Sequence, residues 1–378
     1  MRKKVLRAIL ILAALYGLWL AYEVVGFKTY RSSIALDPVE SRLEVQGVYH
    51  IHTRFSDGRS SLEEIAGHAE AAALDFIVVT DHGNPNFASL AAQGRKGGLL
   101  VLSGSELNVN RGHLVALGFK TPAKPLSTRA EEAVAEVRAL GGFTVIAHPY
   151  SKVKWSWGED AEYSGIEIIN ADTMLKDNIF RVLPYLPLLV AKSRLPLIRM
   201  LEHPGINLKK WDERNAKSPL YGYFSADAHV YYRAMFSLLH LHLLLDEPLA
   251  GDFEKAGNQV FGALRKGKFF NAIDAVAEAR GFRFEALAQG RTYHQGDAVR
   301  PSEDARLEVR APFSFAKEIV LVRDGKEVMR SGENLLRFDT AVPGVYRVEV
   351  FLRESSPLSE EIPWIISNPI HLYKDNRP

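Results

Sequence analysis

Residues 49–58 read YHIHTRFSDG, and this stretch places three metal-ligand side chains within eight positions. His50 and His52 are separated by one residue, and Asp57 follows five positions after the second histidine. Because residues i and i+2 of a strand point to the same face, a strand here would aim both histidines at one point. Asp57 would return to that point from the loop beyond. The pattern indicates a metal site, but two polar residues on a solvated strand face would give the same local sequence.

The composition is that of an ordinary globular protein. The chain has 378 residues, of which 47% are hydrophobic and 24% charged, and its formal net charge is +2. This length suits one large domain and a smaller one. The near-neutral charge gives no indication of a nucleic-acid partner, which normally requires a concentrated basic face. The chain has no cysteine, which excludes disulfides, catalytic thiols and thiolate metal ligands.

The first 27 residues, MRKKVLRAILILAALYGLWLAYEVVGF, differ from the rest of the chain. Four basic residues precede an uncharged apolar run from Ala8 to Tyr22, which approaches the length that crosses a bilayer. The basic leader predicts a cytoplasmic N-terminus, with the remainder periplasmic or extracellular. We predict an uncleaved, single-pass signal anchor in the cell membrane. A cleaved signal peptide is the alternative, but the exit of the run, WLAYE, fits its small-residue pattern poorly.

Seven short apolar runs follow a polar segment at residues 28–46, which we predict to be a tether. The runs are GVYHIH, DFIVVTDH, GLLVLSGSE, HLVALGF, GFTVIAHP, GIEIIN and YGYFSADAH. Several are continuously apolar, as is typical of strands buried on both faces of a parallel sheet. Capping-box spacings at Ser61–Glu64 and Thr128–Glu131 predict helices between some of them. The alternation predicts an α/β fold, and the polar strand ends favour a (β/α) barrel over residues 47–280.

Two further regions have other patterns. Residues 173–219 are rich in Leu and Pro and are predicted to be an insertion packed against the barrel. A lid, or a surface that lies on the bilayer near the anchor, are the alternatives. Residues 281–378 alternate with period two, and Asp324-Gly325 marks a hairpin turn. We predict a small all-β, immunoglobulin-like sandwich for this last region.

Ligand-type side chains gather at the ends of six predicted strands. The set comprises His50, His52, Asp57, His82, Glu106, His113, His148, Asp227 and His229. A single histidine in such a position is usually a structural residue with hydrogen-bond partners. Nine such groups on one rim would be costly if left unpaired, through desolvation and mutual repulsion. A multinuclear metal cluster satisfies all of them at once. We interpret the other six histidines of the chain as structural or solvent-exposed.

The ordered series HIHTRFSDG, TDHG, SELNV with GHLVALG, IAHP and DAH resembles the metal-binding motifs of the PHP (polymerase and histidinol phosphatase) superfamily. The resemblance covers residues 47–280. It implies a distorted seven-stranded (β/α) barrel, two to three divalent metal ions (Zn, Mn or Fe) and phosphoesterase activity. The N-terminal anchor and the C-terminal sandwich resemble a membrane-anchored subgroup of predicted phosphoesterases rather than the DNA-polymerase or histidinol-phosphatase branches.

The resemblance also implies how the ligands are shared. The first metal would be bound by His50, His52, Glu106 and Asp227, the second by Glu106, His113 and His148, and the third by Asp57, His82 and His229. Asp57 stands where some relatives have histidine, a departure that bears on the number or identity of the metals.

The expected reaction is hydrolysis of a phosphate mono- or diester. Histidine and carboxylate ligands suit Zn, Mn or Fe, and a hydroxide held between two such ions about 3.5–4 Å apart would attack phosphorus. Asp57, Asp227 or His229 would then protonate the leaving oxygen. The substrate would be a small-molecule or envelope-derived phosphate ester. The sequence does not indicate the oligomeric state.

Four basic residues lie within a few positions of the ligand motifs, and we predict that they bind the substrate phosphate. They are Arg59, Arg111, Lys152 and Arg233, although each is equally readable as a solvated surface charge. Two other functions stay open. The metal site would hydrolyse a carboxylic ester, amide or carbamate with fewer cations nearby, or the chain would be a metal-binding envelope protein without activity. The intact set of nine ligand-type residues argues against the last.

Overall fold

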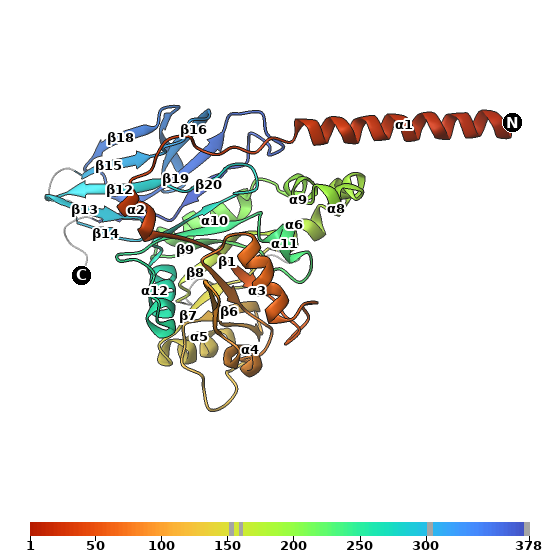
Figure 1. The fold of residues 1–378 in the computed structure, drawn as a ribbon. Coiled ribbons are helices and arrows are strands. Elements are labelled where there is room, and N and C mark those ends of the chain that lie inside the picture. The colour runs from red at the N-terminus through yellow and green to blue at the C-terminus, as the bar shows by residue number, and fades with distance from the viewer. Residues whose placement is uncertain (151–154, 159–161, 301–304, 374–378) are drawn as a thin grey trace.

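The protein has a mixed α/β fold in which three sheets are flanked by helices (Figure 1). The computed structural model describes residues 1–150, 155–158, 162–300 and 305–373. Figure 1 shows helix α1 (Arg2–Gly26) projecting away from the body. None of its residues is buried, and by length and composition it is able to cross a membrane. The N-terminal apolar helix is therefore present as predicted.

The first sheet carries the YHIHTRFSDG motif at the end of its strand β1. Its first part consists of β1 (Glu44–Ile51), β2 (Phe76–Val79), β3 (Gly94–Lys96), β4 (Leu99–Ser103) and β10 (His240–Leu244). β1, β2 and β4 pair in parallel in this order, whereas β10 pairs antiparallel to β1 and β3 antiparallel to β4. Every residue of β2 and β4 is buried, as expected for strands covered on both faces.

A second sheet of five strands continues from the first. Its order is β5 (Ser105–Val109), β6 (Gly112–Leu117), β7 (Phe143–Ile146), β8 (Gly165–Asn170) and β9 (Tyr221–Ser225). β7, β8 and β9 are parallel, but β6 is antiparallel to both of its neighbours. The prediction of parallel strands is therefore wrong for the HLVALGF run, because only the two residues Asn110 and Arg111 join β5 to β6 and so short a loop reverses the chain.

Both edge strands of the second sheet, β5 and β9, are joined to strands of the first sheet. Gly104 alone separates β4 from β5. After β9 the chain returns to β1, where the Ala226 and Ala228 amides donate to the carbonyls of Tyr49 and His50 at 3.1 and 3.2 Å. The seven apolar runs of the sequence contain β1, β2, β4 and β6 to β9. Their carboxyl ends, together with the start of the reversed β6, therefore lie at a common rim.

Two of the flanking helices test the predicted capping boxes. α3 (Leu62–Ala71) begins after Ser61, whose side chain accepts from the Glu64 amide while the Glu64 carboxylate accepts from the Ser61 amide. This capping box is confirmed. α5 (Ala130–Ala139) begins two residues after Thr128, and its first residue Ala130 donates its amide to Asn110 instead. The predicted cap at Thr128 is wrong, because a residue from another loop takes its place.

The predicted insertion forms a series of short helices between β8 and β9. They are α6 (Ala171–Asp177), α7 (Ile179–Val182), the 3₁₀ helix η1 (Leu183–Tyr185), α8 (Leu188–Ala191), α9 (Arg194–Met200) and α10 (Gly205–Asn215). Pro184, Pro187 and Pro204 lie at or next to the first residues of three of these helices. Proline is tolerated in the first turn of a helix but not in its interior. The spacing of the prolines therefore explains why the segment forms several short helices.

Among the described residues after 281, all regular secondary structure consists of β-strands. β12 (Arg283–Ala288), β13 (Arg291–His294), β15 (Ala305–Arg310) and β18 (Leu335–Thr340) form the third sheet. The remaining strands are β14 (Ala298–Val299), β16 (Lys317–Arg323), β17 (Lys326–Ser331), β19 (Gly344–Leu352), β20 (Ile365–Ser367) and β21 (Ile370–Leu372). They extend the first sheet, because β20 pairs with β11 (Phe269–Ala272), which pairs with β10. The predicted hairpin turn at Asp324-Gly325 is confirmed.

The segment predicted as a tether runs along the body. Tyr30 forms a bridge with Ala277, and the Ser32 hydroxyl donates to the Pro312 carbonyl at 2.7 Å. The short helix α2 (Pro38–Leu43) follows and leads directly into β1. The last two helices, α11 (Tyr232–Met235) and α12 (Phe253–Lys266), flank β10. Residues 28–43 are thus part of the folded body rather than a length of free chain.

Candidate metal centre

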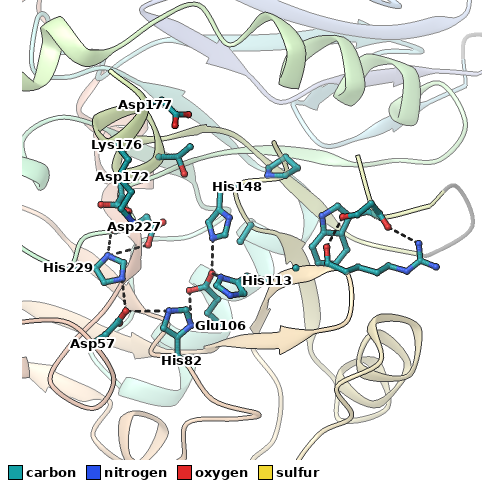
Figure 2. Close-up of a pocket in the computed structure, with 17 residues that line it drawn as sticks. Asp57, His82, Glu106, His113, His148, Asp172, Lys176, Asp177, Asp227 and His229 are labelled. Carbon is teal, nitrogen blue, oxygen red and sulfur yellow. Dashed lines mark hydrogen bonds and ion pairs between the residues drawn. The ribbon is translucent and has the colours of Figure 1, made fainter. Parts of the chain in front are cut away.

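The nine predicted ligands come together at the rim where the two sheets meet. Seven of them line one cavity of about 410 Å³, and Figure 2 shows their side chains pointing toward one another. The other two, His50 and His52, are fully buried and form the floor beneath the seven. The structure therefore gathers the whole predicted set into one place.

Strand ends deliver these side chains to the rim. His50 is the penultimate residue of β1, and His148 and Asp227 are the second residues after β7 and β9. His113 lies at the beginning of β6 rather than at its end. Because β6 runs opposite to its neighbours, the start of this strand lies level with the carboxyl ends of the others. The antiparallel strand thus explains why one ligand-type residue precedes its apolar run.

Glu106 is the centre of the cluster. Its carboxylate is 1% exposed, and Oε2 lies 3.1 Å from Nε2 of both His50 and His52. The other oxygen, Oε1, lies 2.8 Å from His113 Nδ1 and 3.0 Å from His148 Nε2. Burial alone would raise the pKa of Glu106, but the surrounding histidines, His50 first, hold it well below the ordinary value. Glu106 is therefore ionised, and each of its two oxygens lies close to several imidazole rings.

Two aspartates complete the arrangement on the other side. Asp227 Oδ1 lies 3.4 Å from His50 Nε2 and 3.2 Å from His52 Nε2. Asp57 is exposed, and its Oδ2 lies 3.3 Å from His229 Nε2 and 3.7 Å from His82 Nε2. Burial of His52 opposes its protonation, but the nearby carboxylates of Asp227 and Glu106 raise its pKa to about 9. The buried carboxylates of Glu106 and Asp227 thus favour positive charge on the two histidines between them.

Three buried imidazole nitrogens test whether this set fits a metal. His52 Nε2, His82 Nδ1 and His113 Nδ1 make no hydrogen bond with any described residue. Each nevertheless lies within 2.8–3.3 Å of a Glu106 oxygen. Buried polar atoms without a partner are rare, and nitrogens that face a shared carboxylate in this way suit a cation between them. Together with the carboxylates, they form a donor set typical of Zn, Mn or Fe, so the residues present fit divalent metal ions.

The ligand atoms fall into overlapping groups within 4.8 Å of one another. One group is His50, His52, Glu106 and Asp227, a second is His82, Glu106 and His113, and a third is His52, Asp57, His82 and His229. The first matches the first predicted metal. The second brings His82 to Glu106 and His113, where the resemblance implied His148, and the third adds His52 to the three residues expected. The clustered side chains as a whole fit a metal-dependent hydrolase.

Three residues of the rim have a backbone conformation that is uncommon outside glycine. The φ angles of His50, His148 and Asp227 are 66°, 26° and 48°. Such conformations are unfavourable for residues with a Cβ atom and persist only where the surrounding structure imposes them. The surrounding structure therefore holds three of the nine candidate ligands in an unfavourable backbone conformation.

The sequence analysis missed several residues that hold the ligands in place. Glu167, in the middle of β8, is fully buried and accepts from His50 Nδ1 at 2.6 Å and from the His148 amide at 2.8 Å. Asn170 donates to both Glu167 and Asp227. The hydrogen bond to Nδ1 leaves His50 Nε2 facing Glu106. A carboxylate behind a histidine orients the imidazole ring of a metal ligand in the same way. A single glutamate within the apolar run GIEIIN was the available signal.

A second missed group comes from the insertion. Asp172, Thr173, Lys176 and Asp177 of α6 line the cavity, and Figure 2 shows Asp172 and Lys176 above Asp227. Lys176 forms an ion pair with Asp172, and burial of the lysine is outweighed by this contact, so its pKa is raised. The insertion therefore forms one wall of the cavity. No sequence motif indicated these residues, which lie at the beginning of the segment between β8 and β9.

The predicted phosphate-binding residues are distributed between different places. Arg111 lines the metal cavity, where it pairs with Glu131 and donates to the Ser156 carbonyl at 2.9 Å. Arg59 and Arg233 line another pocket, on the side of α11. Lys152 lies outside the described residues. Of the three described cations, the structure thus brings only Arg111 to the candidate ligands.

No protein-family model matches the chain. An uncharacterized protein of Methanocaldococcus jannaschii is 28% identical over 137 residues, which are 32% of this chain and 80% of that protein.

Similar solved structures were found at low sequence identity. One is a two-domain protein from Bacteroides vulgatus containing a predicted PHP-like metal-dependent phosphoesterase (14% identical, 90% of this chain and 99% of that chain, TM-score 0.45). Another, from Bifidobacterium adolescentis, is described as a proposed metal-dependent phosphoesterase (13% identical, 49% and 87%, TM-score 0.34). The third is an amidohydrolase from Chromobacterium violaceum with bound sulfate and no metal (19% identical, 48% and 87%, TM-score 0.33).

Proposed function

We propose that this protein is a metal-dependent phosphoesterase that hydrolyses a phosphate mono- or diester at the rim centred on Glu106. The observation that carries the proposal is the set of three buried imidazole nitrogens without hydrogen bonds around one shared carboxylate. The ordered motif series of residues 47–280 supports the superfamily. We also propose that β1, β2, β4 and β6 to β9 form its distorted seven-stranded barrel, which the hydrogen bonds between the two sheets support.

Divalent ions bound by this set would activate a water molecule and neutralise negative charge on the phosphoryl oxygens. The chain's own residues determine where this takes place. Glu167 and Asn170 hold His50 and Asp227 in position from beneath. Asp57 is exposed at the edge of the cavity and His229 lies beside it. These two residues are placed to transfer a proton to the leaving oxygen, whereas Asp227 is buried and engaged with His50 and His52.

Substrate phosphate would meet Arg111 and Lys176, the described cations of the cavity. Each already forms an ion pair with a carboxylate, Glu131 and Asp172 respectively. A phosphate group would therefore have to share or replace these partners. The same pairing favours a second candidate function, hydrolysis of a carboxylic ester or amide, because that reaction needs fewer cations to hold the substrate.

We further propose that α1 anchors the protein in the cell membrane, with the metal centre on the extracytoplasmic side. The support is the apolar length of α1 and the basic residues at its beginning. The substrate would then be a phosphate ester of small-molecule or envelope origin.

Metal analysis combined with turnover tests this proposal. The full-length protein, purified in detergent, would be assayed for Zn, Mn and Fe and for hydrolysis of a phosphomonoester, a phosphodiester and an aryl ester. His50→Ala and Asp227→Ala are expected to lose bound metal and activity together. His203→Ala is the matched control, because His203 is exposed and distant from the rim.

The result expected is two to three metal ions per chain and turnover of a phosphate ester that both rim variants abolish. Bound metal with turnover of the aryl ester alone would select the second candidate function. A chain that binds no divalent metal would contradict both.

A further inference from the structure

The insertion carries a patch of exposed apolar side chains far from the metal ligands in sequence. We define the apolar tip as residues 179–187, which span α7, η1 and the start of the connection to α8. Its exposed members are Ile179, Phe180, Leu183, Pro184, Leu186 and Pro187. Phe180 is 81% exposed, and its large neighbours are between 38% and 44% exposed. Contiguous apolar surface of this kind marks an interaction site on a water-soluble body.

The tip is packed directly against the N-terminal helix. Tyr185, in the middle of the tip, forms a small core with Trp19 and Leu20 of α1, and the Tyr16 hydroxyl donates to the Pro184 carbonyl at 2.6 Å. Figure 1 shows α8 and α9 beside the end of α1 that is nearer the body. The apolar surface of α1 is therefore in direct contact with the tip.

The depth of this contact follows from helix geometry. α1 rises about 1.5 Å per residue, so about 20 residues cross the hydrocarbon core. A span of about 20 residues that begins after Arg7 ends near Phe27. Trp19 then lies in the body-proximal half of the span, and Tyr16 lies close to its middle. The contacts of Tyr16 and Trp19 with the tip then lie below the surface of the adjacent leaflet. We propose that the apolar tip is a second membrane contact, inserted into the lipid leaflet beside α1.

The charges around the tip suit a lipid surface. Residues 178–201 contain Arg181, Lys192, Arg194 and Arg199 and no acidic residue. Glu202, the next residue along the chain, lies 3.6 Å from Arg181. Arg199 pairs with Glu23 of α1 at 2.8 Å, where the helix leaves its apolar run. Long basic side chains bury their stems in apolar surroundings and place their charge at the level of lipid phosphates. This combination of an apolar tip and a basic margin selects a phospholipid leaflet over a neutral protein partner.

Site-specific fluorescence tests the proposal in the full-length protein. The chain has no cysteine, so Phe180→Cys and Leu183→Cys each provide a unique site for an environment-sensitive dye. The variants would be reconstituted in vesicles of phosphatidylcholine and phosphatidylglycerol, with or without nitroxide-labelled acyl chains. Leu12→Cys, in the middle of α1, is the positive control. Phe87→Cys is the matched control, because Phe87 is 44% exposed on α4 (Phe87–Ala91), at the end of the body away from α1.

Dyes at positions 180 and 183 are expected to show blue-shifted emission and to be quenched by the nitroxide lipid at least half as strongly as the dye at position 12. The dye at position 87 should show neither effect. Quenching at 180 and 183 no greater than at 87 would overturn the proposal. Blue-shifted emission without quenching would also overturn it, because protein rather than lipid would then cover the tip. An unquenched dye at position 12 would reject the proposed anchor and the tip contact together, whereas the phosphoesterase proposal would stand, since no turnover is measured.

Discussion

Glu167 shows how single buried side chains organise the rim. It lies beneath the candidate ligands, receives the Nδ1 hydrogen of His50 and also holds the His148 backbone. A carboxylate in this position fixes the imidazole ring and increases its basicity toward a metal. The residue-level organisation of the site thus depends on groups that never face the substrate.

Replacing Glu167 by Gln is expected to weaken metal binding and activity about 10–100-fold, because His50 would lose its charged partner. The measurement is metal affinity by competition with a chromophoric chelator, together with turnover. Glu162→Gln removes an exposed glutamate that pairs with Arg138 and should change neither. Unaltered metal affinity in Glu167→Gln would show that Glu167 has only a structural role.

The buried contacts of His242, which lies away from the rim, predict how the stability of the protein depends on pH. Its ring nitrogens lie 2.9 Å from Glu44 and 2.8 Å from Asp274. Burial opposes protonation, but the charge and hydrogen bonds of Asp274 and Glu44 raise its pKa to about 9. The folded pKa exceeds the unfolded value near 6.5, so the stabilisation is complete below pH 6.5 and is lost as the pH rises through about 9.

Urea midpoints of the wild type and His242→Gln, measured from pH 6 to 10, check this. The stability difference between the two proteins should shrink across that window. A difference that stays constant with pH would contradict the assignment of charge to His242.

At the scale of the elements, the sequence predicted strands more reliably than their directions. Continuous apolar runs identified β1, β2 and β4, because burial on both faces leaves a clear pattern. The reversal of β6 and the start of α5 at Ala130 depend on the loop at Asn110, whose side chain accepts from the Ala130 amide at 3.0 Å. Such contacts between distant loops have no local signature. For the same reason, nearness to a motif did not distinguish Arg111 from Arg59.

The close packing around Gly104, which connects β4 to β5, leads to a testable prediction. A Cβ atom added there would lie 2.3 Å from the Ala116 carbonyl oxygen of β6. Gly104→Ala is therefore expected to destabilise the protein by about 1–3 kcal/mol, because the strands would have to separate, and to shift Glu106, two residues later. Thermal unfolding and metal content measure the two effects. Gly98→Ala, where a Cβ atom would meet nothing within 4 Å, should leave both close to the wild type.

At the scale of the whole molecule, the C-terminal strands are joined to the rest of the body by a shared sheet and by a buried ion pair. Arg347 of β19 is 4% exposed, and its Nε and Nη2 atoms each lie 2.9 Å from an oxygen of Asp212 in α10. Its guanidinium also lies over the Trp211 ring, 5.5 Å from the centroid. The insertion is therefore held between β19 and the rim that carries the candidate ligands.

Asp212→Ala is expected to destabilise the whole chain by about 3 kcal/mol, because it removes one carboxylate from a buried guanidinium. Urea unfolding followed by circular dichroism gives the value. The exposed pair of Arg306 and Asp339 provides the control, and Asp339→Ala should have a much smaller effect. Equal effects of the two variants would mean that the Arg347 pair adds no more than a surface contact.

The junction between α1 and the body has a consequence for what the protein can reach. Tyr16 and Glu23 bind the insertion, and the chain beyond them is hydrogen-bonded along the body through Tyr30 and Ser32. In the proposed membrane-anchored arrangement, these contacts would hold the body at a fixed height relative to the bilayer. The body would encounter molecules that diffuse in the plane of the membrane at a high effective concentration. Molecules farther from the membrane would reach the metal centre only by diffusing to it through the solvent.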